Sequence, residues 1–171
     1  MRTVVVLAAL ALTPVLARAQ RITPVCQPLV DAAKKQIMTP HHAWVTQGGR
    51  TTESISIGGA TYIQVRGAWR RSPMTQKDAL DQMQENLRTA TVYTCERVGN
   101  ESVEGVPAVV YTSHVENQGV KADAKTWIAT ATGLILRQEE DMGTDDATGT
   151  THMSIRWDYS NVHAPAGVGA P

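Results

Sequence analysis

Apolar residues recur every three or four positions in two parts of the chain, which is the spacing of one face of an α-helix. The first part predicts a helix from about Pro24 to Met38, ended by Thr39-Pro40, because the residue before a proline disfavours helical conformation. The second predicts a helix from about Gln76 to Thr89, with Thr75 and Asp78 as a capping box. The apolar stripe of this second helix consists of Leu80, Met83 and Leu87.

Elsewhere apolar and polar residues alternate at every second position, which predicts β-strands with one apolar face. The expected strands are His42 to Thr46, Thr52 to Ile57, Ala60 to Arg66, Thr91 to Val98, Glu101 to Glu104, Ala108 to Glu116, Lys121 to Thr130, Leu134 to Asp141 and His152 to Tyr159. Gly58-Gly59 and Gly99-Asn100 are expected to be turns, and Gly143 to Gly149 a polar loop. Asn161 to Pro171 is rich in Gly, Ala and Pro, and we expect residues 163–171 to form a flexible tail.

The order of these elements predicts an α+β fold. Antiparallel strands with one apolar face need a second layer to cover that face, and the two amphipathic helices can supply it. We therefore expect a curved antiparallel sheet, a half-barrel, with two helices covering its concave face. Residues 20–162 would form this single domain.

The first residues of the chain have the pattern of a secretory signal peptide. Arg2 precedes an apolar run from Val4 to Leu16, and Ala17-Arg18-Ala19 places small residues where signal peptidase cleaves. The run is too short to span a membrane. We expect cleavage after Ala19, a soluble periplasmic protein, and no membrane-spanning segment after cleavage.

The charge balance is nearly neutral, with 16 basic and 16 acidic residues in the whole chain. Removal of residues 1–19 takes away Arg2 and Arg18 and leaves 14 basic and 16 acidic residues. Such a surface argues against binding of nucleic acid.

Cys26 and Cys95 are the only cysteines. In an oxidising compartment an even pair is most simply a disulfide, which would join the first helix to a strand in the middle of the sheet. A redox or metal-binding pair is the alternative, but neither cysteine belongs to a Cys-x-x-Cys motif or has a neighbouring histidine.

Several fragments resemble the periplasmic lipoprotein-carrier superfamily of LolA/LppX-like half-barrels. A strand with a tryptophan, Lys125 to Ile128, leads into the Thr-Gly-Leu turn and Leu-Arg strand of Thr132 to Glu139. The stretch Tyr62 to Arg70 is similar to an earlier strand of these proteins, and Asp158 to Val162 is similar to their ending. The resemblance implies a half-barrel plugged by helices, and transport or chaperoning of an apolar molecule.

The apolar faces of the strands supply a candidate ligand cavity. Its residues would be Ile63, Val65, Val109, Tyr111, Ile128, Met153, Ile155 and Trp157. A closed, well-packed core is the alternative interpretation of the same residues. The absence of phenylalanine and the presence of six methionines favour an adaptable lining.

A second candidate site is a contact point for a partner protein. Trp69, Arg70 and Arg71 are expected in the connection before the second helix, where an aromatic ring beside two arginines suits a partner or an acyl head group. The alternative is that Trp69 packs beneath the helix while the arginines remain in water.

The remaining histidines and acidic residues fit structural or solvent-exposed positions better than catalytic or metal-binding ones. His41 and His42 are adjacent and would point to opposite faces of a strand, so they do not suit a shared metal. His114 and His152 fall on the polar faces of their strands. The acidic stretch Glu139 to Asp146 is expected to be a solvated loop. The chain has no Gly-x-Ser-x-Gly elbow and no phosphate-binding loop.

These observations lead to one expected function and two others. We expect a periplasmic binding or carrier protein for a lipid, an acylated polypeptide or a hydrophobic peptide, without enzymatic activity, cofactor or metal. A module that contacts or senses envelope proteins is the second hypothesis, and a hydrolase using His114 and His152 is the third. The sequence leaves the oligomeric state open.

Overall fold

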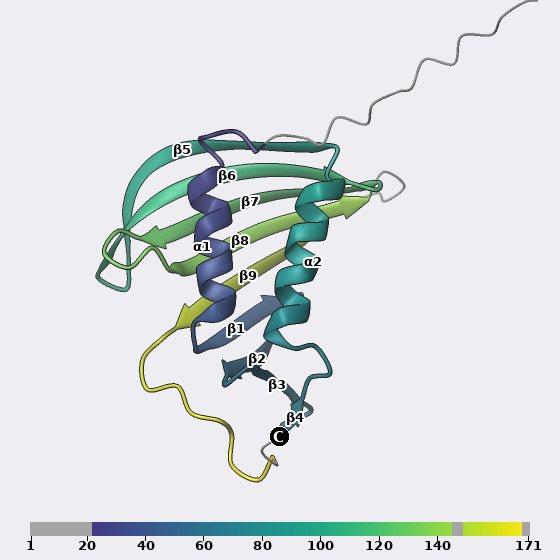
Figure 1. The fold of residues 1–171 in the computed structure, drawn as a ribbon, viewed down its shortest axis with the longest axis vertical. Helices are drawn as coiled ribbons and strands as arrows, with labels where there is room; N and C mark the ends of the chain where they lie inside the picture. The colour runs from purple at the N-terminus through teal and green to yellow at the C-terminus, as the bar shows by residue number, and fades with distance from the viewer. Residues whose placement is uncertain (1–21, 145–148, 169–171) are drawn as a thin grey trace, which may run out of the picture.

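The structure is a computed structural model that describes residues 22–144 and 149–168. Within these residues, one antiparallel sheet of nine strands is covered on one face by two helices (Figure 1). The strand order is β4-β3-β2-β1-β9-β8-β7-β6-β5. The expected α+β fold, an open curved sheet with two helices on its concave face, is confirmed. The expected signal peptide, residues 1–19, lies outside the described residues.

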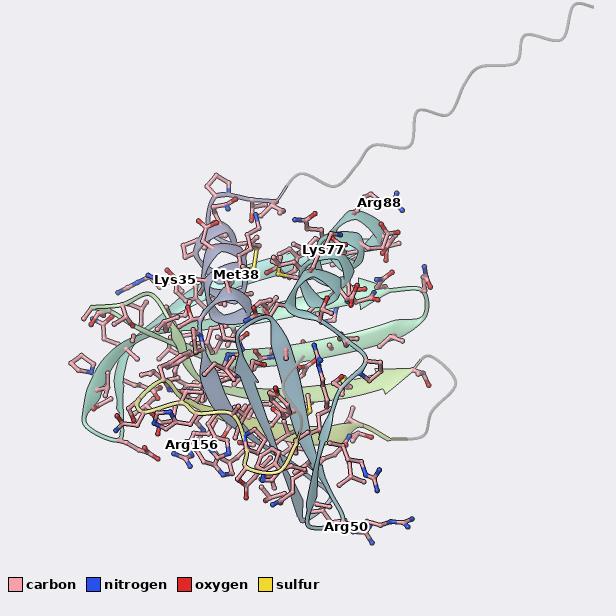
Figure 2. All side chains as sticks on the ribbon, turned by 60° about the horizontal axis from the view of Figure 1, so that its bottom comes forward. Lys35, Met38, Arg50, Lys77, Arg88 and Arg156 are labelled. Atoms are coloured by element: carbon pink, nitrogen blue, oxygen red, sulfur yellow. A yellow bond between two sulfur atoms is a disulfide. The ribbon has the colours of Figure 1, made fainter. Side chains whose placement is uncertain are left out.

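The elements have the following bounds: α1 Gln27–Met38, β1 His41–Gln47, β2 Arg50–Ile57, β3 Ala60–Val65, β4 Ala68–Arg71, α2 Gln76–Thr89, β5 Val92–Val103, β6 Val106–Asn117, β7 Val120–Ala129, β8 Ile135–Thr144 and β9 Thr151–Asp158. The strands β1 to β4 turn steeply away from β5 to β8, and Arg50 marks the end of the β1–β2 hairpin farthest from the helices (Figure 2). Both helices lie in front of β5 to β9, side by side (Figure 1).

Helix α2 has the predicted bounds because its start is encoded locally. The Thr75 side chain accepts a hydrogen bond from the Asp78 backbone N–H, and Asp78 accepts one from the Thr75 backbone N–H at 2.8 Å. Helix α1 begins later than expected, at Gln27 rather than Pro24. Pro28 has no N–H, so it fits only the first turn of a helix, and the residues before Cys26 form a turn instead.

The sheet differs from the sequence-based expectation at three places. Ala68–Arg71 is the edge strand β4 and not a connection, because Arg66 and Gly67 adopt the positive φ values of a tight hairpin turn (52° and 78°). Gly99-Asn100 does not turn: β5 continues through a bulge between Arg97 and Gly99, since β6 pairs with it along its whole length. Strand β8 extends into the expected loop as far as Thr144.

The disulfide between Cys26 and Cys95 is confirmed, with a Cα–Cα distance of 5.3 Å. Its position in the sheet was predicted wrongly. Cys95 lies on β5, which is an edge strand and not a central one. The reason is that β9 returns to pair with β1, so the middle of the sheet is built from the end of the chain.

The core lies between α1 and the concave face of β6 to β8. It consists of Leu29, Ala32, Tyr111, Ile128 and Ile135, with Ala33, Cys95, Val109 and Trp157 packed against it. A smaller apolar cluster lies on the opposite, outer face, where Trp127 covers Val110 and Ala108. The Trp127 ring is in turn covered by Lys125 and Arg137, and its Nε1 donates to Glu101 at 2.7 Å.

The two helices of the described residues have 12 and 14 residues, fewer than the roughly 20 apolar residues that a membrane-spanning helix needs.

Candidate functional site

A cavity of about 750 Å³ lies between the two helices and the concave face of β5 to β8. The helices contribute Leu29, Ala33, Ala79, Gln82, Met83, Asn86 and Leu87 to its wall. The strands contribute Tyr93, Ser113, Val115, Asn117, Val120, Ala122, Ala124, Thr126, Ile135, Gln138, Glu140 and Met142, and Met74, Ala90 and Gln118 complete it. This volume falls in the range of small-molecule sites, about 300–1,000 Å³.

Small side chains on β7 make room for the cavity. The residues of β7 that face the helices include Ala122 and Ala124, which pair in register with Val115 and Ser113 of β6. Larger residues at these two positions would reach toward α2. The concave face therefore has a low floor at β7, the third strand from the β5 edge.

Helix α2 stands off from this floor. None of its fourteen residues, all of which are described, is buried, and its apolar stripe of Leu80, Met83 and Leu87 is only half-buried. Lys77 and Arg88 on its polar side are exposed (Figure 2). An amphipathic helix is ordinarily held in place by burial of its apolar stripe. The apolar side chains of α2 are only partly covered by the sheet, so they leave apolar surface available to a bound molecule.

Helix α1, by contrast, is tightly held. Leu29, Val30 and Ala32 are buried, and the disulfide fixes its first turn to β5. At the other end, Gln76 of α2 donates a hydrogen bond from Nε2 to the Ile37 carbonyl at 2.9 Å. The cavity thus has one rigid wall, α1, and one more loosely held wall, α2.

Glu140 is the only charged residue among the described residues that line the cavity. It lies on the floor, where Gln138 donates a hydrogen bond from Nε2 to its Oε2 at 2.9 Å. Desolvation raises the pKa of the Glu140 carboxyl, and the hydrogen bond from Gln138 opposes this only in part. Burial also raises the pKa of the Tyr93 hydroxyl, the only other titratable group among the described residues of the wall.

Asn117 lines the cavity where β6 meets the end of α2. Its Nδ2 donates to Thr89 Oγ1 at 3.1 Å, which ties β6 to the last turn of α2. Its Oδ1 is a buried oxygen that has no hydrogen-bond partner among the described residues. Buried acceptors normally have a donor, so this oxygen is an unsatisfied acceptor behind the cavity wall.

The eight residues predicted to line a cavity all lie on the concave face, as the strand register shows. None of them belongs to the wall of the 750 Å³ cavity. Val109, Tyr111, Ile128 and Trp157 pack together in the core beside α1, and Trp157 also lines a second cavity of about 350 Å³. Met153 and Ile155 lie on β9, next to the floor, while Ile63 and Val65 lie on the distant strand β3.

Sequence reasoning missed the residues that do line the cavity. Glu140 was expected in a solvated loop, but it belongs to β8 and faces inward, whereas Glu139 and Asp141 face outward. Asp145 and Asp146, the rest of that acidic stretch, lie outside the described residues. The signal was present as alternation: small residues at every second position of β7, and Gln138, Glu140 and Met142 at every second position of β8.

Trp69, Arg70 and Arg71 lie on the edge strand β4, where they alternate between the two faces of the sheet. Trp69 is half-buried and its ring makes an edge contact with His42, with 6.2 Å between centroids. His42 stacks on Trp44, and the Arg156 guanidinium lies 3.9 Å from the centroid of the Trp44 ring. This row stabilises the outer face of β1, β4 and β9, and both arginines of β4 are exposed.

The four histidines of the sheet all have hydrogen-bond partners in the protein. His41 is buried and its Nδ1 lies 2.8 Å from the Thr39 carbonyl, and burial lowers the pKa of its imidazole. On the outer face, His114 pairs with Asp123 at 2.8 Å and His152 with Asp141 at 2.9 Å. The two carboxylates beside His114 raise the pKa of its imidazole. No cluster suited to a metal ion occurs within residues 22–144 and 149–168.

The position of Glu140 has a measurable consequence for stability. Because its pKa is raised in the folded protein, ionisation of Glu140 above its ordinary pKa of 4.5 destabilises the fold. We expect Glu140→Gln to raise the free energy of unfolding at neutral pH by less than about 1 kcal/mol, because the half-buried carboxylate keeps part of its water. The gain should vanish below about pH 4, where both states hold a neutral group.

Thermal unfolding of the two proteins across this pH range measures the effect. Glu139→Gln is the matched control, because Glu139 faces outward and pairs with Arg137. A Glu140→Gln protein that is less stable than the wild type at neutral pH would contradict the prediction.

No protein-family model matches the sequence, and no curated protein matches it. Among solved structures, the lipoprotein LppX of Mycobacterium tuberculosis aligns with 81% of this chain and 95% of its own, at 12% identity and a TM-score of 0.47. LprF of Mycobacterium bovis aligns with 86% of this chain and 96% of its own, at 12% identity and a TM-score of 0.46. A DUF1329 family protein of Desulfovibrio piger reaches 14% identity and a TM-score of 0.31 over 86% of this chain and 96% of its own. With TM-scores below 0.5, these likenesses carry no argument about a ligand, which has to come from the residues of the cavity.

Proposed function

We propose that this protein binds and carries an apolar molecule, with an alkyl chain held in the cavity beneath α2. The observation that carries the proposal is the position of Met83 and Leu87, two half-buried residues of the apolar stripe of α2 that line the cavity opposite Ala122 and Ala124 of the sheet. A chain in this space would bury apolar surface on both sides. Each Å² removed from water contributes about 25 cal/mol to binding.

Entry of a ligand requires movement of only one wall. Helix α1 is held by the disulfide and three buried side chains, whereas α2 has no buried residue among its described positions. A small displacement of α2 would widen the cavity without breaking the core between α1 and β6 to β8. We therefore infer that α2 acts as the movable cover.

The proposed compartment is the periplasm, reached through a signal peptide cleaved after Ala19. A disulfide that closes much of the domain fits an oxidising compartment. The proposed role needs no cofactor, metal or catalysis. The two His–carboxylate pairs lie on the outer face, away from the cavity, which favours a binding protein over a hydrolase.

The packing of Trp69 favours a carrier protein over an envelope-interaction module. That ring packs against His42 instead of standing free, so the expected exposed anchor for a partner is weakened. A pull-down from envelope extract that is lost in Trp69→Ala but kept in Met83→Gln would favour the interaction module instead.

The direct test is retention of apolar molecules. The mature protein is incubated with a total lipid extract, separated from excess lipid and analysed by native mass spectrometry. We expect a bound species with one alkyl or acyl chain per protein. A protein that retains no apolar molecule from the extract, and binds no dodecyl amphiphile in solution, would overturn the proposal.

A further inference from the structure

Glu140 occupies an unusual environment for a carboxylate. Its cross-strand neighbours on the concave face are Ala124 of β7 and Met153 of β9, and its neighbours along β8 are Gln138 and Met142. None of these four side chains carries a charge. The residues of α1 and α2 that line the same cavity are also uncharged.

Residues 22–144 and 149–168 supply no cation to this carboxylate. Within the described part of the chain, neither lysine, arginine nor histidine forms an ion pair with Glu140, and its hydrogen bond comes from the amide of Gln138. Its two neighbours differ in this respect, because Glu139 pairs with Arg137 and Asp141 with His152 on the outer face. An unpaired carboxylate in a desolvated site opposes folding, so Glu140 serves no evident structural purpose.

We propose that Glu140 binds the ammonium group of a cationic amphiphile whose alkyl chain lies in the cavity. This inference rests on the proposed function and specifies the class of ligand. An ammonium group would supply the positive charge and the hydrogen-bond donors that the site lacks. A charge-assisted hydrogen bond in a site of low dielectric is stronger than one between neutral groups.

The same geometry disfavours other head groups. A carboxylate or phosphate would face the Glu140 carboxylate with no basic side chain in the described wall to bind it. A hydroxyl group can donate one hydrogen bond to Glu140 but cannot compensate its charge. The expected order of affinity is therefore amine, then alcohol, then carboxylate, for ligands with the same alkyl chain.

Three probes with one chain length test this order. Dodecylamine, dodecanol and dodecanoate compete with the neutral fluorescent probe N-phenyl-1-naphthylamine for the mature protein at neutral pH. The measurement is repeated on Glu140→Gln, which is close in shape, and on Glu139→Gln, which removes a charge from the outer face of the same strand.

We expect Glu140→Gln to weaken dodecylamine binding by about tenfold or more and to leave dodecanol within about twofold. Glu139→Gln should leave both affinities unchanged. If dodecylamine and dodecanol bind the wild type with equal affinity, or lose affinity equally in Glu140→Gln, the role of Glu140 is refuted while the proposed function stands. If no probe binds the wild type, the proposed function fails and the role of Glu140 fails with it.

Discussion

Replacement of Ala122 and Ala124 by phenylalanine is expected to weaken binding of dodecanol by about 100-fold while the protein keeps its fold. Both alanines are half-buried on the cavity floor and point toward α2. A phenylalanine ring can bury about 150–250 Å², so two rings would occupy the space proposed for the alkyl chain. Loss of about 110 Å² of apolar contact corresponds to about 2.7 kcal/mol, which is about 100-fold in affinity.

The same variant distinguishes between two interpretations of this region, a ligand cavity and an ordinary packed core. Extra volume forced into a filled core destabilises a protein, whereas extra volume placed in an empty cavity adds contacts. We therefore expect the Tm of the double variant to be equal to or higher than that of the wild type. Displacement of the fluorescent probe and thermal unfolding measure the two effects on one sample.

Lys121→Phe is the matched control for this experiment. It adds the same ring to the same strand on the outer face, where Lys121 forms a loose 3.8 Å pair with Glu116. Lys121 does not belong to the cavity wall, so the affinity for dodecanol should change little. A double variant that is strongly destabilised, or that still binds dodecanol as the wild type does, would show that the space beneath α2 is not the binding site.

Removal of the disulfide is expected to have the largest effect on stability. Cys26→Ser with Cys95→Ser releases two residues that are 69 positions apart in sequence, and the chain-entropy relation gives about 4 kcal/mol for a loop of this length. Urea unfolding measures the loss. The variant should still fold, because Leu29, Val30 and Ala32 keep α1 packed on the sheet.

A reducing agent provides the internal control for the disulfide variant. It should lower the unfolding midpoint of the wild type toward that of the double-serine protein and leave the variant unchanged. Equal midpoints for the oxidised wild type and the variant would mean that α1 is held by its apolar contacts alone. In that case the disulfide would not contribute to the rigidity of α1 as a wall of the cavity.

The elements of this protein were predictable where their signals are local. The bounds of α2 were correct because Thr75 and Asp78 form a reciprocal cap within one turn. The start of α1 was wrong because two prolines, Pro24 and Pro28, both suit a helix N-terminus and only the second is used. The strand β4 was missed because four residues are too few to show a periodic pattern.

The faces of the strands were predictable for the same reason. Alternation within each strand gives Tyr111 of β6, Ile128 of β7 and Ile155 of β9 the apolar side of their own strand. The register of the strands brings all three to the concave face. The pattern of a single strand does not show whether such a residue packs under a helix or borders an open space. The core beside α1 and the cavity beneath α2 use the same face.

The sequence by itself determined the α+β class, the two amphipathic helices, the disulfide and the concave-facing side of residues such as Tyr111 and Ile155. Each of these follows from spacing along the chain or from a simple count of cysteines. Only the tertiary structure decided that β5 is an edge strand, that α2 stands away from the sheet and that Glu140 faces the resulting cavity. A cavity is set by the separation of surfaces that are distant in sequence, because the size of a side chain matters only against the side chain opposite it.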